Sequence, residues 1–318
     1  MVIRPWAWKR SCYGTITLCM IMRNEERLLQ RCLDSVKGLV DEIIIVDTGS
    51  TDRSIAIAIE NGARVLEDPW MDDFAAPRNK GIDRATKDWI LIMDPDEVVS
   101  KKDHGKIRRL TAKGGIAAYR IATRNYTNNP MMQGAVPNNN EYEEGRGWFG
   151  YTPSLKTRLF RRESGLRFMG RWHELLDYSV DPSKHRVVTT DVPIHHYAHE
   201  INQKNIAEKR EFYLRMGEKK VADDPENDQA WWELAVAEGM IGYFPRTVRS
   251  ILMSMRKGYY TADRLFQLVF ALNKMGRGGE AQYYFEKAIC KLYPNLTHYE
   301  EGLRKLPSFE PHLERKIA

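Results

Sequence analysis

The sequence is poor in cysteine and has no long apolar run. Its 318 residues include only 4 cysteines, and none of them forms a Cys-x-x-Cys pair. We therefore expect a reduced, cytoplasmic protein in which Cys19 and Cys32 are buried as small apolar residues. No stretch approaches the ~20 apolar residues of a membrane-spanning helix, and the amino-terminal residues lack the apolar centre of a signal peptide.

Composition narrows the class of protein further. Hydrophobic residues make up 42% of the chain and charged residues 29%, which excludes wholesale disorder and is typical of a protein with a buried core. The length suits one large domain and a smaller one. The net charge of +6 favours anionic partners, such as nucleotides, nucleic acid or an acidic membrane surface, and does not choose among them.

The first hundred residues alternate between strand-like and helix-like patterns. Short apolar runs predict four strands, at residues 15–22, 42–46, 63–66 and 89–93. Apolar residues with helical spacing lie between them, and the last of these helices is expected over Arg78–Ala85. The alternation predicts right-handed crossovers and a doubly wound α/β sheet.

Residues 114–199 give mixed signals. Strands are predicted at residues 117–122, 157–161 and 166–169. Between the first two, Asn125–Gly150 is a long polar stretch that is rich in Asn, Gly, Pro and Met. Connections of this length are usually functional or disordered, and we interpret this one as a lid.

After residue 200 the pattern becomes helical. Ala281, Phe285 and Ala288 have the small–large–small spacing of a tetratricopeptide helix pair. We therefore expect two domains, residues 1–200 and 201–318, of which the second is all-α with about two repeats. The expected helices cover residues 202–221, 228–240, 246–256, 262–275 and 279–293.

Two carboxylates follow the fourth predicted strand. Asp94 and Asp96 flank Pro95, which stiffens the turn between them. Ligands of open α/β sheets bind outside the carboxyl ends of the strands. Two carboxylates at that edge suit a hard divalent cation that also holds a diphosphate. The alternative interpretation is a solvated acidic turn.

Three other loops carry candidate ligand contacts. Asp47 also ends a strand, where it could bind a ribose or a base, or form a turn that caps the next helix. Asn24 and Glu25 open the first helix, and an acidic residue there suits the helix dipole. Arg78 and Asn79 are expected at a helix start, where a bound phosphate would balance the cation.

Glu174 and the histidines supply further candidates. Glu174 follows Trp172 and His173, and it is either a general base in a partly apolar pocket or a surface residue. His195 and His199 have i, i+4 spacing but no acidic motif between them, so a structural zinc site is not expected. One histidine of this group is a better candidate for an extra ligand to a diphosphate-bound metal.

Five segments, taken in order, resemble the family 2 glycosyltransferases over roughly the first two-thirds of the chain. They are TLCMIMRNEERLLQRCLDSV, DEIIIVDTGSTD, DDFAAPRNKGIDRATKDWILIMDPDE, TRLFRRESGLRFMGRWHE and PIHHYAH. In particular, the chain resembles the bacterial branch with tetratricopeptide-like helices after the catalytic domain, which includes the peptide S-glycosyltransferases of glycocin biosynthesis. The resemblance implies a GT-A fold with a mixed, mainly parallel sheet, followed by an all-α domain. It also implies a nucleotide-diphosphate sugar donor, with a UDP-sugar preferred, Mn²⁺ or Mg²⁺, and inversion at the anomeric carbon.

The resemblance also implies roles for individual residues. Asp94 and Asp96 match the DxD element at which a metal bridges the donor diphosphate. His196 matches a further metal ligand, although Ala198 stands where glycine is usual. Glu174 matches the position of the base.

The remaining candidates are residues for donor binding and alternative general bases. The residues implied in donor binding are Asn24, Glu25, Asp47, Arg78 and Asn79, together with Asp94. If Glu174 is not the base, Asp72, Asp73 and Glu97 are next in line.

The acceptor is less constrained than the donor. A repeat domain offers a concave surface of the kind that grips peptides, so we expect a peptide or protein acceptor, and a homodimer could form through the same domain. Two enzyme alternatives are a modified base of phage DNA, which the positive charge keeps open, and a lipooligosaccharide core. A non-catalytic peptide-binding module is the alternative of another class, and the intact Asp94 and Asp96 argue against it.

Overall fold

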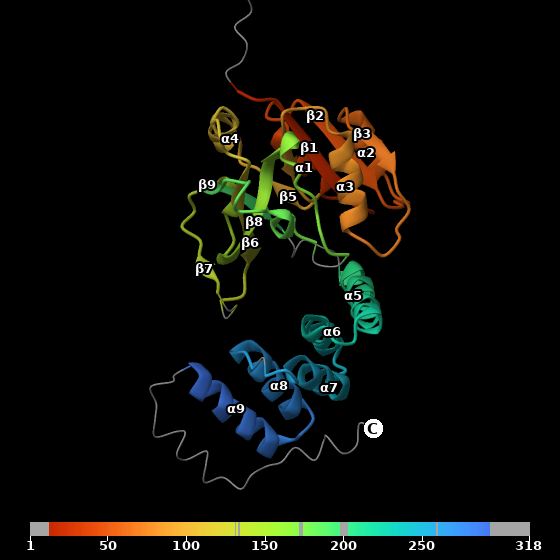
Figure 1. Cartoon of the computed structure of the whole chain (residues 1–318), viewed down its shortest axis with the longest axis vertical. Coiled ribbons are helices and arrows are strands. Elements are labelled where there is room, and N and C mark those ends of the chain that lie inside the picture. Colours follow the sequence, from red (N-terminus) through yellow and green to blue (C-terminus); the bar gives the residue numbers. More distant parts are fainter. Residues whose placement is uncertain are drawn as a thin grey trace, which may run out of the picture. The chain divides into compact units, whose positions relative to one another are not determined.

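The structure, a computed structural model, describes residues 13–130, 132, 134–171, 174–197, 203–258 and 260–292. The chain divides into two compact units, Met1–Ile201 and Asn202–Ala318. In Figure 1 the ribbon of the first unit runs from red to green and that of the second from blue-green to blue. In the described part of the chain, no helix is long and apolar enough to cross a membrane.

One mixed sheet forms the centre of the first unit, in the order β3-β2-β1-β4-β8-β6-β9-β5, with β7 paired to β8. Its first four strands are parallel neighbours. They are β1 (Ile16–Met22), β2 (Glu42–Asp47), β3 (Arg64–Glu67) and β4 (Trp89–Ile92). All four strand predictions are confirmed, because a parallel strand covered on both faces is apolar along most of its length.

Helices cover both faces of this parallel half. They are α1 (Leu29–Val36), α2 (Ser54–Glu60), α3 (Ala75–Arg84) and α4 (His104–Thr111). Successive side chains of a strand point to opposite faces. Accordingly, Leu18 of β1 packs in the core that includes α1, α2 and α4, whereas Cys19 packs in the core that includes α3. Cys19 and Cys32 are buried free thiols, as expected.

The other half of the sheet is mostly antiparallel. Its strands are β5 (Glu97–Val98), β6 (Ala118–Thr127), β7 (Val136–Pro137), β8 (Gly150–Arg161) and β9 (Val187–His196). The long β8 pairs antiparallel with β4 and with β6. β6 runs parallel to β9, which runs antiparallel to β5. Single 3-10 turns lie at Lys101–Asp103, Glu143–Gly145, Arg162–Ser164 and Leu176–Ser179.

Three predictions for this unit need correction. The stretch predicted as a lid is shorter than 125–150, because β6 continues to Thr127, β8 begins at Gly150 and β7 pairs with β8 between them. Residues 166–169 form no strand and contribute only an isolated bridge from Met169. α3 begins three residues before Arg78, because Asp73 accepts a hydrogen bond from the Ala76 amide (3.0 Å) at its start.

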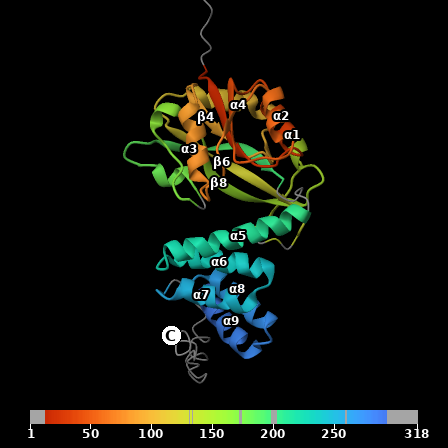
Figure 2. The same ribbon diagram turned by 90° about the vertical axis from the view of Figure 1, so that its right-hand side faces the viewer.

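The second unit is a stack of helices, each packed against the next along the chain (Figure 2). They are α5 (Gln203–Asp223), α6 (Asp228–Ile241), α7 (Phe244–Met255), α8 (Ala262–Lys274) and α9 (Gly278–Leu292). α8 begins 34 residues after α6, and α9 begins 34 residues after α7, which is the period of the tetratricopeptide repeat. The expected all-α region and its two helix pairs are confirmed.

Candidate active site

The loops after β1 and β2 are joined by reciprocal hydrogen bonds. Asn24, in the left-handed conformation with φ 56°, receives a hydrogen bond from the Thr51 amide at its side-chain oxygen (2.8 Å) and donates its own amide to Ser50 Oγ (2.9 Å). The Glu25 amide donates to Ser54 Oγ at 2.7 Å. Asn24 and Glu25 are therefore fixed beside the end of β2, next to Asp47.

Asp47 combines the two uses predicted for it. Its Oδ2 accepts hydrogen bonds from the amides of Gly49 (3.0 Å) and Ser50 (2.9 Å), which is the predicted turn. Its Oδ1 is buried and has no hydrogen-bond partner among the described residues. A buried carboxylate oxygen without a partner is costly, so this atom is a strong candidate for contact with a bound ligand.

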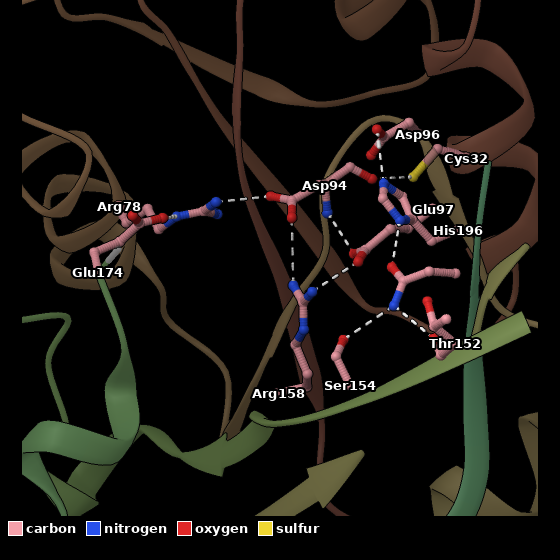
Figure 3. A network of polar contacts seen from close by, with 11 residues as sticks. Cys32, Arg78, Asp94, Asp96, Glu97, Thr152, Ser154, Arg158, Glu174 and His196 are labelled. Carbon is pink, nitrogen blue, oxygen red and sulfur yellow. Dashed lines mark hydrogen bonds and ion pairs between the residues drawn. The ribbon is translucent and has the colours of Figure 1, made fainter. Parts of the chain in front are cut away.

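Asp94 lies between two arginines at the end of β4 (Figure 3). Arg78 Nη2 contacts its Oδ1 at 2.8 Å, and Arg158 Nη1 lies 3.6 Å from its Oδ2. Burial alone would raise the pKa of the Asp94 carboxyl, but the two guanidinium groups outweigh burial and hold this pKa well below its usual range. The two arginines thus favour the ionised form of Asp94.

Arg78 also holds Glu174. Its Nε donates to Glu174 Oε1 at 2.8 Å, so one buried guanidinium bridges two carboxylates from different loops. Because α3 begins at Ala75, Arg78 lies inside the helix. Asp94 and Glu174 balance its charge, but Arg78 Nη1 is buried and has no hydrogen-bond partner among the described residues, so the phosphate contact stays a prediction.

Asp96 and His196 come together although they are 100 positions apart in the sequence. His196 Nε2 lies 3.0 Å from Asp96 Oδ2, and the two side chains are partly exposed (Figure 3). Burial lowers the pKa of His196, but the hydrogen bond to Asp96 and the charges of Glu97 and Asp94 give a net raised value. The Asp96 carboxylate suits either Mn²⁺ or Mg²⁺, whereas the imidazole beside it suits a transition metal such as Mn²⁺ better than Mg²⁺.

Neighbouring histidines of β9 have different surroundings. His195 is fully buried on the opposite side of the strand from His196, where its Nδ1 lies 2.7 Å from the hydroxyl of Tyr126. Burial, followed by the charges of Arg124 and Lys102, lowers its pKa to about 3, so the ring is neutral. The structure thus separates one histidine for the site from one that belongs to the core. His199, with Ala198, lies outside the described residues.

The other predicted residues have mainly structural contacts. Both ends of the Asn79 amide pair with the backbone of Phe168, at 2.9 and 3.0 Å. Asp72 accepts a hydrogen bond from the Trp70 indole (3.1 Å), and Asp73 accepts one from the Ala76 amide in the first turn of α3. Trp172 and His173 lie outside the described residues.

Glu97 is tied to the same cluster. Its Oε1 accepts from Arg158 Nη2 (2.7 Å), and its Oε2 accepts from the Asp94 amide (2.8 Å). Burial raises the pKa of Glu97 to about 7, while Arg158 lowers it. Because both carboxylate oxygens of Glu97 accept hydrogen bonds from within the protein, Glu97 supports the turn and is not an approachable base.

Sequence reasoning missed Arg158 and Asn125. Arg158 lies on β8 and binds two acidic residues that are about sixty positions away in the sequence. The alternation in TRLFRR could have indicated an inward-facing arginine, but it could not have named the partners. A hollow beside this cluster is lined by Arg78, Asp94, Lys156, Arg158, Glu174 and Asp177, among others.

Comparison with known proteins settles the family. Residues 17–166 match the model of "Glycosyl transferase family 2". A TPR repeat-containing protein of Synechococcus elongatus is 36% identical over 305 residues, which are 93% of this chain and 69% of that protein. The chain belongs to glycosyl transferase family 2. It is an enzyme of the glycosyltransferase class, as the sequence motifs predicted.

Further similarities place this family 2 glycosyltransferase among known proteins. The prophage-derived glycosyltransferase SunS of Bacillus subtilis is 27% identical over 223 residues, which cover 69% of this chain and 48% of SunS. The chain therefore spans about half the length of that relative. Among solved structures, it is similar to S. aureus TarS 1–349 in complex with UDP-GlcNAc, with 14% identity and a TM-score of 0.48, over 86% of this chain and 90% of that one.

A metal site in this enzyme would be incomplete on protein ligands alone. The described residues contain no group of three or more His, Cys, Asp or Glu side chains arranged to hold a metal ion. Asp96 and His196 could supply two ligands, whereas Asp94 is engaged by arginines. Two protein ligands still fit Mg²⁺ or Mn²⁺, which are commonly completed by water and substrate phosphates.

Proposed function

We propose that this enzyme is an inverting, metal-dependent glycosyltransferase that moves a sugar from a UDP-sugar to a peptide or protein side chain. The observation that carries the proposal is the meeting of Asp96 with His196 at the carboxyl edge of the sheet, in the unit that also holds Asp47 and Asp94. In open α/β sheets this edge is where ligands bind.

The donor's nucleoside has a candidate partner in Asp47. Its buried Oδ1 can accept a hydrogen bond from the imide N–H of uracil or from a ribose hydroxyl. The linked loops of Asn24 and Ser50 hold this oxygen in place before the donor arrives. A loop fixed in advance loses little entropy on binding, which favours affinity.

The donor's diphosphate would be held through Asp96 and His196. A divalent ion bound there would neutralise the charge that develops on the departing nucleoside diphosphate. Asp94, kept ionised by Arg78 and Arg158, is suited to accept hydrogen bonds from the hydroxyls of the transferred sugar. In this proposal Asp94 faces the donor and the two direct protein ligands are Asp96 and His196.

Glu174 is the proposed general base. Arg78 fixes its orientation through Oε1, and both border the same hollow as Asp94. The acceptor nucleophile loses its proton to Glu174 and forms a bond to the anomeric carbon, while the bond from that carbon to the diphosphate oxygen breaks. Attack from the face opposite the leaving group inverts the configuration. The base must come within about 3 Å of the acceptor atom.

We infer a peptide acceptor from two features. The chain resembles the peptide S-glycosyltransferases of glycocin biosynthesis, and its second unit has the 34-residue helix-pair period of peptide-gripping repeats. A DNA base and a lipooligosaccharide core are the outcomes against which the acceptor test discriminates.

A mass-spectrometric transfer assay tests the proposal. The purified chain is given UDP-sugars, Mn²⁺ and, in separate reactions, cysteine- and serine-containing peptides, DNA with hydroxymethylated bases, and lipooligosaccharide. We expect sugar adducts on peptide only. Adducts on DNA or lipooligosaccharide alone would overturn the peptide acceptor, and the absence of donor hydrolysis with every UDP-sugar would overturn the UDP-sugar donor.

Variants test the roles of the two acidic residues. Asp96→Asn should lower turnover at least about 100-fold, and Glu174→Gln should lower kcat by about 10²–10⁴-fold with donor affinity within about threefold of the parent. Glu163→Gln is the control, because Glu163 is exposed and lies outside the site. Parent-like turnover in Glu174→Gln would move the base elsewhere.

A further inference from the structure

A row of polar side chains crosses the sheet behind the proposed metal ligands. Asn125 of β6 is in register with Thr152 of β8 on one side and with His196 of β9 on the other. His196 is in turn in register with Glu97 of β5, the residue after Asp96. Figure 3 shows the end of this row from Thr152 and Ser154 to His196. Asn125 is therefore placed to act on His196 from the side away from Asp96.

The orientation of the Asn125 amide follows from its partners. Its Nδ2 lies 2.8 Å from the Thr152 carbonyl oxygen, which can only accept a hydrogen bond. The NH₂ group must therefore face Thr152, with Ser154 Oγ as a second acceptor at 3.3 Å. This leaves Oδ1 to face His196 Nδ1 at 2.7 Å, and because Oδ1 accepts, Nδ1 must carry the proton.

We infer that Asn125 is a positioning residue that fixes the His196 tautomer required for metal binding, an inference that rests on the metal-dependent function proposed above. With the proton held on Nδ1, an ion that takes the place of the Nε2 proton would meet the Nε2 lone pair of a neutral ring beside Asp96, whose Oδ2 lies 3.0 Å from Nε2. Asp96 alone would favour the opposite tautomer, because a carboxylate attracts a proton to the nitrogen it faces. Asn125 opposes that preference and keeps Nε2 available as a ligand.

The fold gives this arrangement rigidity. β6 lies between β8 and β9, so its backbone is paired with a strand on each side at Asn125. The amide is held by the main chain of one strand and orients a side chain of another. Histidine ligands whose second nitrogen has a fixed acceptor typically bind metal about 10- to 100-fold more tightly than those without one.

The test uses the full chain and three variants. Asn125→Leu removes the acceptor and keeps the number and branching of the side-chain heavy atoms, and Asn125→Asp keeps an oxygen opposite Nδ1. Asn138→Leu is the matched control, because the Asn138 amide also donates to backbone carbonyls, those of Gly145 and Trp148, but touches no proposed ligand. Mn²⁺ binding in the presence of UDP is measured from the spin-resonance signal of free Mn²⁺, and UDP binding without metal is measured by calorimetry.

We expect Asn125→Leu to weaken Mn²⁺ binding about 10- to 100-fold and to leave metal-free UDP binding unchanged. Asn125→Asp should restore Mn²⁺ affinity to within about threefold of the parent, and Asn138→Leu should not alter it. Nitrogen-15 spectra of histidine-labelled protein with Mg²⁺ and UDP, assigned with His196→Gln, should show the proton on Nδ1 in the parent. That signature should be lost in Asn125→Leu.

Contrary results separate the two proposals. Mn²⁺ affinity within twofold of the parent in Asn125→Leu, or an equal loss in Asn138→Leu, would overturn the role of Asn125 while leaving the metal site in place. A parent that binds no Mn²⁺ with UDP would overturn the metal-dependent function and this inference with it.

Discussion

The two units of the chain are stabilised in different ways. The first encloses titratable groups: Arg158 and Glu97 are almost completely buried, and their partners come from distant parts of the sequence. The core of the second consists mainly of apolar residues such as Ile251, Leu268 and Ala288, and its buried Glu238 pairs with Arg246 only eight positions away. A buried ion pair contributes little net stability and often costs some. The difference therefore indicates that the first unit gives up stability for a site, whereas the second has a core that serves packing.

The two units also differ in how the starts of their helices are stabilised. In the second unit, the N-cap side chains of Asn227 and Thr261 accept hydrogen bonds from the backbone of α6 and α8, whereas that of Tyr243 at the start of α7 does not. The N-cap residues of α1 to α4 make no such side-chain bond. There, the loops before the helices are occupied with contacts to other loops, as at Asn24 and Ser50. Local rules fix the second unit, and non-local contacts fix the first.

The largest effect is expected at Arg158. Arg158→Met leaves Asp94 and Glu97 without their shared cation in a buried place, which should lower the stability of the first unit by about 3–5 kcal/mol. Hydrogen exchange read by mass spectrometry should show faster exchange in β4 and β8 and unchanged exchange in α6 to α9. Lys257→Met in the second unit is the control, because that lysine is half exposed and should contribute less than about 1 kcal/mol. Equal losses of stability in Arg158→Met and Lys257→Met would contradict this difference between the two units.

A cavity in the core of the second unit should destabilise that unit and leave the first unit unchanged. Leu268 is fully buried, and Leu268→Ala should cost about 2–5 kcal/mol through lost packing and the space left behind. Exchange should accelerate in α6 to α9, while hydrolysis of the UDP-sugar without acceptor keeps its parental rate. A matching loss of protection in β1 and β2 would show that the units do not unfold separately.

A smaller effect is expected at a helix cap. Asn227→Ala removes the acceptor for the Ala230 amide (3.0 Å) and should destabilise the second unit by about 1 kcal/mol. Asn227→Asp should recover most of that loss, since aspartate is an equally good cap. Urea unfolding followed by circular dichroism measures both; a parent-like midpoint in Asn227→Ala would contradict a role for local capping.

The smallest effect concerns Glu238, the buried acid of the second unit. Burial raises its pKa above the ordinary 4.5, although Arg246 opposes this. The folded state therefore binds the proton more tightly than the unfolded state. Its stability should fall as the pH rises from about 4.5 through the folded-state pKa, by at most about 1.4 kcal/mol per pH unit. Glu238→Gln should remove this slope in unfolding experiments, and an unchanged slope would contradict the assignment.

Much of the fold could be predicted because local patterns decide it. The strands β1 to β4 were predicted to within about a residue, since buried parallel strands are apolar runs. The helices α5 to α9 follow from apolar spacing together with Gly and Pro. The start of α3 was placed too late, because Asp73 begins the helix before the apolar spacing becomes visible.

The site was predictable only in part. Ligands of open α/β sheets bind at strand ends, and this rule indicated Asp47, Asp94 and Asp96. The family resemblance indicated His196. Neither kind of evidence reveals that β8 and β6 bring Arg158 and Asn125 to these residues, because pairing of strands many positions apart leaves no mark in a single sequence. The extension of β6 through the polar Asn125 was missed for the same reason.

The central claim, that the enzyme holds its donor through a metal at Asp96 and His196, has one direct test. Crystals of the full chain grown with UDP and Mn²⁺ give an anomalous signal at the metal position. We predict one strong peak within about 2.2 Å of a carboxylate oxygen of Asp96 and of His196 Nε2, beside the diphosphate. Bound UDP with no peak there, or with Mn²⁺ at a different set of residues, would contradict the account.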